Sequence, residues 1–268
     1  MLILKYEGGD ADQHRIDALT GGESLEGLGR AVSLVSHYVA TGEVRQRAPY
    51  SREARFLFTA NRAGSLEWLL QYVQNNPGEI AVDLGINGIT ALVGWLFAKA
   101  VGGRSAAVPA SVTDLDEARS GDLEALVEAI EPSLRKAHRV IGPSVQQILI
   151  INGNNNNVML NFDHDSKEYL EEDIDGGRAT QDVSIASLNV NSRYGRAYFF
   201  DLRRTVPFKI DRYAHGRTIT QLSRALDNYA KKNGIPVEIT FTRVLASDDR
   251  LKRIIIHDAL SADEAEEE

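Results

Sequence analysis

The chain has 268 residues, of which 43% are apolar and 25% are charged, a balance that fits a globular protein able to bury a core. It contains no cysteine, which excludes disulfides, zinc–thiolate sites, iron–sulfur clusters and cysteine nucleophiles. The first ten residues, MLILKYEGGD, lack the basic region and long apolar run of a signal peptide, so we expect a cytoplasmic protein.

Charge is unevenly distributed along the chain. Residues 1–181 carry 16 lysines and arginines against 25 acids, whereas residues 182–260 carry 14 against 8, and the last eight residues add five acids. A basic segment between an acidic segment and an acidic tail indicates separate modules. We therefore predict an α+β protein with a larger N-terminal α+β domain (1–177), a small basic β-rich domain (178–260) and a disordered acidic tail (261–268).

The first predicted helix covers residues 23–42, where apolar residues recur at helical spacing. Ser24 is the expected N-cap, and Gly42 is expected in the left-handed conformation that ends a helix. Gly27 and Gly29 weaken the first turn by about 1 kcal/mol each relative to alanine, which favours close backbone packing at this point.

Strands are predicted on both sides of this helix. Residues 2–8 form the first one, and residues 54–73 alternate as two strands around a turn near 61–65. The N-terminal domain is therefore predicted to begin with the order β-α-β-β.

Residues 80–103 form the most apolar segment of the chain. Its uncharged core is only 11 residues long, whereas a membrane span needs about 20, so a buried or interface helix is favoured over a membrane segment. Small residues recur at every fourth position, which lets another helix approach closely. We expect self-association through this helix, with an interface formed by Thr90, Gly94, Trp95 and Ala98.

The rest of the N-terminal domain is predicted to contain two helices, two strands and a linker. Pro132 should break residues 115–142 into two helices, because proline removes an interior hydrogen bond. Residues 145–152 and 158–165 then pair as strands, and residues 168–177 read as an acidic linker. The full predicted order of this domain is β-α-β-β-α-α-α-β-β.

The sequence NGNNNN at residues 152–157 raises the question of a metal site. It differs from a calcium-binding loop in its first, sixth and twelfth residues, and asparagine and glycine are typical of hairpin turns, so a turn is favoured. If the following strand continues, alternation places Asp163 and Asp165 on one face and His164 on the other. The two aspartates are candidate magnesium ligands, with Asp173 or Asp175 as a third.

The C-terminal module is predicted to have the order β-β-β-α-β-β. Its helix starts with a capping box of Thr218 and Gln221, and a glycine and a proline follow its end. The predicted elements are three strands within 181–212, the helix 218–234, and strands at 237–245 and 251–260.

Aromatic and basic residues are interleaved in this module, as in proteins that bind single-stranded nucleic acid. The alternative interpretation is that one aromatic face is core and the arginines form its solvated side. By strand alternation Tyr198 and Phe200 share a face, and Phe199 lies opposite. The candidate nucleic-acid-binding residues are Arg193, Tyr194, Arg196, Tyr198, Arg203, Arg204, Lys209, Arg212, Arg243, Lys252 and Arg253.

Motifs for other chemistries are absent. The glycines at 22 and 27 have the spacing of a phosphate-binding loop, but Leu28 and Gly29 replace its lysine and serine or threonine. There is no Gly-x-Ser-x-Gly elbow, and the six histidines are scattered. We therefore predict no cofactor and favour a non-enzymatic protein.

Three hypotheses about function remain open. The first is a binding or assembly protein that associates with itself through 80–103. The second is a protein that binds single-stranded DNA or RNA through the C-terminal module. The third is a metal-dependent phosphohydrolase that uses Asp163 and Asp165. The helix after GGESLEGLGR, the hairpin that ends in RAGSLEW, the apolar helix and the C-terminal β module together resemble proteins of bacteria and prophages, which implies a bacterial or phage-type origin and assigns no functional residue.

Overall fold

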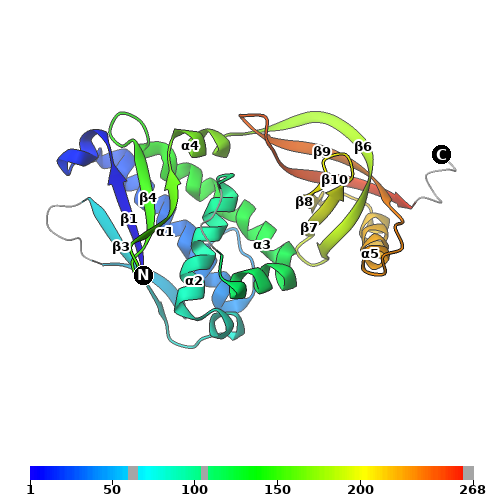
Figure 1. The fold of residues 1–268 in the computed structure, drawn as a ribbon, viewed down its shortest axis with the longest axis horizontal. Helices are drawn as coiled ribbons and strands as arrows, with labels where there is room; N and C mark the ends of the chain where they lie inside the picture. Colours follow the sequence, from blue (N-terminus) through cyan, green and yellow to red (C-terminus); the bar gives the residue numbers. More distant parts are fainter. Residues whose placement is uncertain (60–65, 104–107, 262–268) are drawn as a thin grey trace. The chain divides into compact units, whose positions relative to one another are not determined.

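The computed structural model describes residues 1–59, 66–103 and 108–261, which form two compact units (Figure 1). The first unit takes residues 1–116 and 126–171, and the second takes residues 117–125 together with the chain from residue 172 onward. Helices and sheets occur in both sequence halves, so the protein belongs to the α+β class. The turn predicted at 61–65 and residues 262–268 of the predicted tail lie outside the described residues.

The first unit contains a five-stranded antiparallel sheet with the order β2-β3-β1-β4-β5. Its strands are β1 (Leu2–Glu7), β2 (Ala54–Thr59), β3 (Glu67–Gln74), β4 (Gln147–Asn152) and β5 (Asn157–Phe162). Its helical segments are η1 (Gly9–Gln13), α1 (Ala18–Thr41), α2 (Glu79–Ala100), most of α3 (Ala110–Ala137), η2 (His138–Val140) and α4 (His164–Leu170).

One face of this sheet is buried. In β1 the side chains of Leu2, Leu4 and Tyr6 are buried, whereas the intervening residues are only half-buried. Helices α1 and α2 lie on the buried face (Figure 1). Burying each large apolar side chain contributes about 1.5–3 kcal/mol, so this layer is the core that holds the first unit together.

Helix α1 starts earlier than the sequence suggests. Asp17 is its N-cap, because the Asp17 carboxylate accepts a hydrogen bond from the Thr20 backbone N–H at 2.8 Å. The predicted cap, Ser24, is wrong: it lies inside the helix, fully buried, 3.1 Å from the Tyr6 hydroxyl. The predicted end is confirmed, since Gly42 has a left-handed φ of 73°.

The close packing expected at the start of α1 is found at one of its two glycines. A Cβ on Gly27 would overlap the Ser133 carbonyl oxygen and lie 2.7 Å from the Ala137 backbone nitrogen of α3. A Cβ on Gly29 would meet only the Phe58 ring, at 3.6 Å. Gly27 therefore allows two helix backbones to touch, and Gly29 does not have this role.

Two predictions about the middle of the chain are wrong. Residues 115–142 are not divided at Pro132, which lies in the interior of α3; the helix is interrupted instead at Arg119 (φ −133°, ψ 35°), and the short η2 follows it. The fully buried Leu126, Ile130 and Leu134 around Pro132 supply packing that offsets the proline's cost of about 3 kcal/mol. The predicted acidic linker, 168–177, is instead the end of α4, where Leu170 is buried, followed by the start of strand β6.

The second unit is a closed five-stranded barrel with the order β10-β8-β7-β6-β9. All neighbouring strands are antiparallel except β8 and β10, which are parallel. Numbered within the barrel, the strand order is 1-2-3-5-4, with the helix between the third and fourth strands; this is the connectivity of an OB fold. The elements are β6 (Glu172–Asn189), β7 (Tyr194–Phe199), β8 (Arg204–Ile210), α5 (Gly216–Ala230), β9 (Val237–Ala246) and β10 (Leu251–Ser261).

The barrel has its own apolar core. Helix α5 adds Leu222 and Ala225 to a cluster of strand residues that includes Phe199, Phe208 and Phe241. The predicted capping box at Thr218 is wrong, since the helix starts at Gly216 and the Thr218 hydroxyl donates to Asp258 Oδ1 at 2.9 Å. The β-β-β-α-β-β order predicted for this part of the chain is confirmed.

Candidate nucleic-acid interface

The small-residue stripe of α2 lies inside the first unit. Thr90 and Ala98 are at most 1% exposed, Gly94 is buried, and a Cβ on Gly94 would overlap the Met159 methyl group of β5. Trp95 is half-buried, with the Lys99 ammonium 4.6 Å from its ring centre. The predicted interface of Thr90, Gly94, Trp95 and Ala98 is therefore wrong in its first, second and fourth residues, because these pack against the chain's own core.

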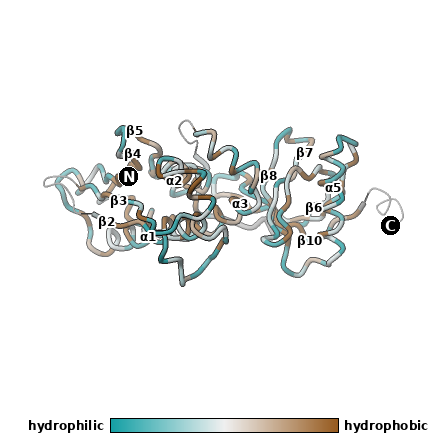
Figure 2. The backbone as a smooth tube through the Cα atoms, turned by 90° about the horizontal axis from the view of Figure 1, so that it is seen from below, coloured by the Kyte–Doolittle hydropathy of each residue, from teal (hydrophilic) through white to brown (hydrophobic). Residues whose placement is uncertain are grey.

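Helix α2 is apolar enough and long enough to cross a membrane, and its hydrophobic residues are drawn brown in Figure 2. However, 61% of its most apolar 18-residue window is buried inside the protein. This is the environment of a core helix in a globular protein.

The asparagine-rich segment is a hairpin turn between β4 and β5, as the sequence predicts. The Asn152 side chain accepts a hydrogen bond from the Asn154 backbone N–H at 3.0 Å, and Asn155 does the same for Asn157 at 3.1 Å. Asn156 adopts a left-handed φ of 56°. Asparagine is favoured here because it tolerates this conformation and hydrogen-bonds to the nearby backbone.

The two candidate metal ligands form no metal site with other described side chains. Strand β5 ends at Phe162, so the alternation expected for Asp163 and Asp165 is wrong. The Asp163 carboxylate caps helix α4 by accepting from the Ser166 backbone N–H at 3.0 Å, and Asp165 lies in the first turn of that helix. Among the described residues, no group of three histidine or acidic side chains has a metal-binding arrangement. The side chains of Asp173 and Asp175 are outside the described set.

Three of the predicted basic residues serve the barrel itself. Lys252 and Arg253 are only 7% and 8% exposed, so their assignment to a nucleic-acid surface is wrong. The Arg193 guanidinium donates to the backbone carbonyl oxygens of Asp211 and Arg212, at 2.8 and 3.1 Å. These side chains are occupied by intramolecular contacts because long cations bury their stems where a partner satisfies the charged end.

Two other candidates are exposed but belong to neither β7 nor β8. Arg212 stacks on the Tyr213 ring, with 4.5 Å between the guanidinium carbon and the ring centre. Arg243 is exposed on β9, 5.8 Å from the centre of the Phe241 ring.

The remaining candidates lie together on β7 and β8. Alternation along β7 buries Gly195, Ala197 and Phe199 in the barrel and turns the other residues outward. In the register of the two strands, Tyr194 faces Lys209 and Tyr198 faces Thr205. We call this surface the β7–β8 face; it comprises Tyr194, Arg196, Tyr198, Phe200, Thr205, Pro207 and Lys209.

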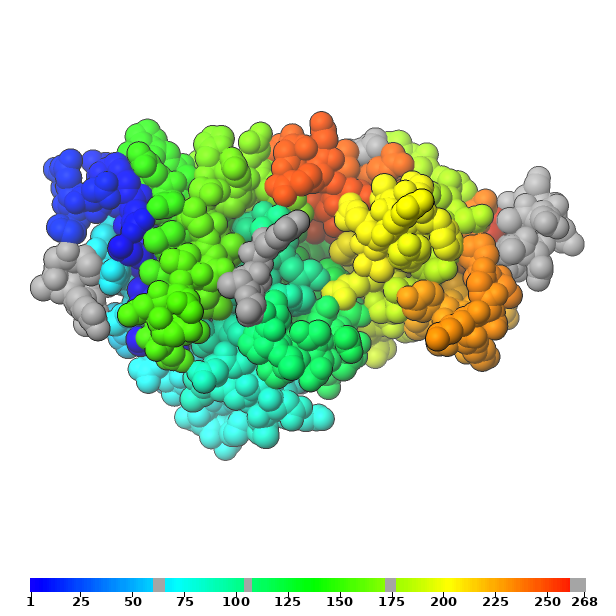
Figure 3. Space-filling model, viewed as in Figure 1, coloured from blue at the N-terminus to red at the C-terminus, as the bar shows by residue number. Residues whose placement is uncertain are grey.

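One end of the β7–β8 face opens into an aromatic pocket of about 560 Å³. The Tyr198 and Phe200 rings meet edge to face, 5.6 Å apart, and Phe200 is 49% exposed. Strand β7 and helix α5, yellow and orange in Figure 3, are both visible on the same side of the barrel. The pocket is lined by Ser184, Tyr198, Phe200, Tyr229, Ala230, Lys232, Gly234 and Ile235.

Cations stand beside this aromatic pocket. Lys232 lines it, and Arg203 and Arg204 are exposed where the β7–β8 turn enters β8. Arg203 has a left-handed φ of 51°, which marks it as a turn residue. Exposed aromatic rings with a lysine in the same pocket and arginines in the adjoining turn can stack on a planar group and pair with an anion at the same time.

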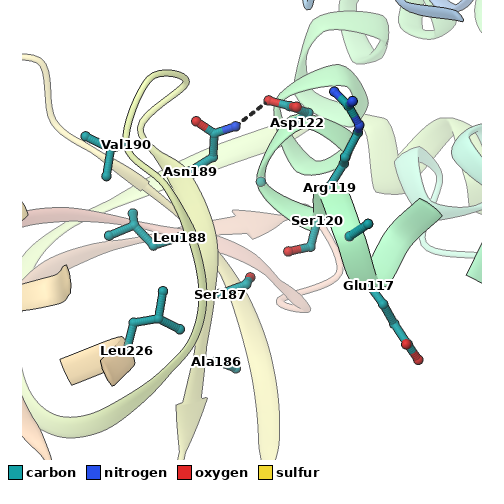
Figure 4. Close-up of a pocket in the computed structure, with 12 residues that line it drawn as sticks. Glu117, Arg119, Ser120, Asp122, Ala186, Ser187, Leu188, Asn189, Val190 and Leu226 are labelled. Atoms are coloured by element: carbon teal, nitrogen blue, oxygen red, sulfur yellow. Dashed lines mark hydrogen bonds between the residues drawn. The ribbon is translucent and has the colours of Figure 1, made fainter. Parts of the chain in front are cut away.

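A second pocket of the same unit, about 730 Å³, lies between residues 117–122 of α3 and residues 186–190 of β6 and its turn (Figure 4). Asn189 donates to the Asp122 carboxylate at 2.8 Å, and burial raises the pKa of Asp122. Within the described part of the chain, the buried Ser187 hydroxyl has no hydrogen-bond partner. This contact between helix and strand is therefore incompletely packed.

Two histidines have hydrogen-bond partners that no local sequence pattern indicates. His257 lies between Asp211, 3.1 Å from its Nδ1, and Thr242, whose hydroxyl is 2.8 Å from its Nε2. This resembles a catalytic triad, but Thr242 is only 8% exposed and lies on the barrel strand β9. We assign the chain of hydrogen bonds to the structure of the barrel.

The other histidine is buried in the first unit. His138 is 1% exposed, and its two ring nitrogens lie 2.7 Å from the Leu134 carbonyl oxygen and 3.0 Å from the Ser166 hydroxyl. Burial lowers the pKa of His138 to about 4. It is a neutral core side chain near pH 7.

Comparison with known proteins identifies the two parts of the chain separately. No curated protein and no solved structure matches it. Residues 179–260, which contain most of the barrel, match the model described as "Family of unknown function (DUF7947)". Residues 2–171 match the model described as "Domain of unknown function (DUF7946)", which covers more than half of the chain. The chain therefore belongs to the DUF7946 family.

Proposed function

We propose that the barrel binds single-stranded nucleic acid, with an unpaired base in the aromatic pocket. The observation that carries the proposal is the aromatic pocket itself: Tyr198 and Phe200 leave ring surface exposed beside Lys232 and the turn arginines. A base offers a flat face for stacking and its phosphate offers a charge, so the two kinds of side chain match the two parts of a nucleotide.

The position of the pocket on the barrel also supports the proposal. In OB folds the outer surface of the second and third strands is a common site for oligonucleotides and oligosaccharides. Strands β7 and β8 hold these places in the second unit. This support is an analogy between folds, so the chemistry of the side chains has to favour the ligand independently. The cation that lines the pocket, Lys232, and the two exposed arginines of the adjoining turn, Arg203 and Arg204, favour an anionic ligand over a neutral sugar.

The geometry favours a single strand over a duplex. In a duplex the bases are stacked on one another, and their faces are unavailable to protein side chains. Tyr198, Phe200 and Tyr229 present rings, and stacking of one base on such rings contributes about 1–3 kcal/mol. We therefore expect weak preference for sequence and a clear preference for unpaired nucleotides.

The test is fluorescence anisotropy of a labelled 12-nucleotide single strand, DNA or RNA, with the full chain at low salt. We expect binding that weakens as salt rises, and a loss of affinity of about ten-fold or more in Phe200→Ala and Tyr198→Ala. The matched control is Tyr213→Ala, since Tyr213 is 77% exposed on the same unit but lies outside the aromatic pocket. Absence of binding at low salt, or equal affinity for a duplex of the same length, would contradict the proposal.

Our second proposal is self-association through α2, with Val82 and Ile86 in place of the interface predicted from the sequence. Val82 and Ile86 are 64% and 61% exposed on the first turns of this helix, around the left-handed Gly85. Two exposed aliphatic side chains four residues apart favour contact with another apolar surface. Light scattering of the wild type and of Val82→Ser/Ile86→Ser distinguishes a concentration-dependent oligomer from a monomer.

A further inference from the structure

The β7–β8 face continues beyond the aromatic pocket to Arg196. Along β7 the outward residues follow one another as Tyr198, Arg196 and Tyr194. Arg196 is thus the next side chain that a strand would meet after its first base is stacked on Tyr198 and Phe200. Its place between two tyrosines is suited to a phosphate with a stacked base on each side.

Arg196 already forms an ion pair with an acidic side chain of the protein, Glu124. Its Nε and Nη2 atoms both lie 2.7 Å from Glu124 Oε1, and the Glu124 side chain is only 4% exposed. Arginine binds carboxylates and phosphates through the same pairs of N–H groups. A nucleic-acid phosphate and the Glu124 carboxylate therefore compete for one guanidinium.

Glu124 reaches Arg196 because the helix segment 117–125 packs closely on the barrel of the second unit. A Cβ on Gly121 would lie 2.6 Å from Asn189 Cβ and 2.7 Å from the Tyr194 carbonyl oxygen. The segment also carries Asp122, which accepts the hydrogen bond from Asn189 (Figure 4). Gly121 lets the segment approach the barrel closely, and Asp122 and Glu124 contact β6 and β7. The two acids place negative charge over the Tyr194–Arg196 end of the β7–β8 face.

Two features of the contact between segment 117–125 and the barrel favour their separation. The pocket of about 730 Å³ lies beside this contact, and the buried Ser187 hydroxyl has no hydrogen-bond partner among the residues that the structure describes. The α3 backbone leaves helical geometry at Arg119, five residues before Glu124. Incomplete packing and an interrupted helix both lower the free energy needed to separate a segment from its support.

We propose that Glu124 is a built-in competitor that sets the length of strand the barrel accepts; this rests on the proposed function. A strand of two or three nucleotides fills the aromatic pocket and leaves the Arg196–Glu124 ion pair in place. A longer strand has to displace Glu124 so that its phosphate binds Arg196. The occupant of this face is thus exchanged between an acidic helix and a single-stranded nucleic acid.

The experiment compares the affinities of a 3-nucleotide and a 12-nucleotide strand for the full chain and two variants. Glu124→Gln removes the charge, and Gly121→Ala keeps every charge but pushes the segment away from the Tyr194 backbone. We expect both variants to bind the 12-mer about ten-fold more tightly and the 3-mer unchanged. Asp114→Asn is the matched control, because Asp114 is exposed on α3 outside the segment 117–125.

A further variant separates competition from a purely structural ion pair. In the Glu124→Gln background, Arg196→Gln should return the 12-mer affinity to the wild-type level or below, with circular dichroism confirming a folded protein. If Glu124→Gln leaves the 12-mer affinity unchanged or lowers it, or if it changes both strands equally, the competition is contradicted. The nucleic-acid proposal still stands in that case, provided that Phe200→Ala weakens binding, whereas a wild type that binds neither strand overturns both.

Discussion

Helix α2 and strand β7 are both rich in apolar residues, yet the protein uses them in opposite ways. In α2 the residues Leu92, Val93 and Leu96 are fully buried and pack inside the first unit. In the β7–β8 hairpin, Phe199 enters the barrel core while Phe200, its neighbour, is 49% exposed. A residue's hydrophobicity therefore does not identify its role; what surrounds it does.

The difference has a structural reason. A helix between a sheet and other helices is covered on several sides, so even its small-residue stripe finds a partner within the chain. A strand in a closed barrel has one face toward the core and one toward the outside, so alternate residues are left at the surface. Where those outward residues are aromatic and flanked by cations, a ligand is the expected partner.

The largest expected effect is on the free energy of unfolding of the first unit. Leu92→Ala should lower the free energy of unfolding of the first unit by about 3 kcal/mol, because it leaves a cavity in a fully buried site. The two tryptophans, Trp68 and Trp95, both belong to the first unit, so tryptophan fluorescence during urea denaturation reports on that unit alone. Phe200→Ala should leave this transition unchanged; a shift of similar size would contradict the separation.

The buried histidine of the first unit predicts a pH dependence. The pKa of His138 is about 4 in the folded protein against an ordinary value of 6.5, so the unfolded chain binds more protons between these values. The free energy of unfolding should therefore fall as pH decreases from about 6.5 to 4, by about 3 kcal/mol at most. His138→Gln should flatten this part of the profile in tryptophan-detected denaturation. An identical slope in the variant would show that other groups cause it.

The two glycines of α1 give a matched pair with a smaller effect. Gly27→Ala should destabilise the first unit by about 2 kcal/mol, since the methyl group overlaps backbone atoms of α3 that cannot rotate away. Gly29→Ala should be neutral or stabilising by up to about 1 kcal/mol, because it meets only the Phe58 ring at 3.6 Å and gains helix propensity. Equal effects in the two variants would remove the assignment of Gly27 as a contact between helix backbones.

The smallest effect concerns the cations beside the aromatic pocket. If Arg203 and Arg204 each contact one phosphate, replacing both with glutamine should reduce the slope of log affinity against log salt by about 1.4 for a single strand. Tryptophan-detected stability should not change, since both side chains are exposed and belong to the second unit. An unchanged slope would place the phosphates elsewhere on the barrel.

Local patterns predicted much of the fold. Most strands, the apolar helix, the Gly42 helix end and the β-β-β-α-β-β order follow from periodicity and from turn residues. The errors occurred where a distant contact outweighed a local signal. Pro132 lies within a helix because buried neighbours stabilise it, and Ser24 is a buried partner of Tyr6 instead of a cap.

The candidate site was predicted less completely. Alternation alone put Tyr198 and Phe200 on one face, and the structure has their rings 5.6 Å apart. Tyr229 and Ile235, which complete the pocket, come from α5 and the segment after it, and no local pattern links them to β7. Lys252 and Arg253 show the converse, because their charge suggested a surface position and their neighbours bury them.

The sequence by itself determined the class of fold, the segregation of positive charge into residues 182–260, and the alternation that turns aromatic side chains outward on β7. These properties depend on residues close together in the chain, where φ/ψ preferences and side-chain period act directly. Only the tertiary structure decided which cations make contacts within the protein, that α2 is buried in its own unit, and that Glu124 forms an ion pair with Arg196. Those outcomes depend on pairs of residues far apart in the sequence, whose contacts arise only when each unit folds: α2 packs on the sheet of the first unit, and the helix segment 117–125 packs on the closed barrel of the second.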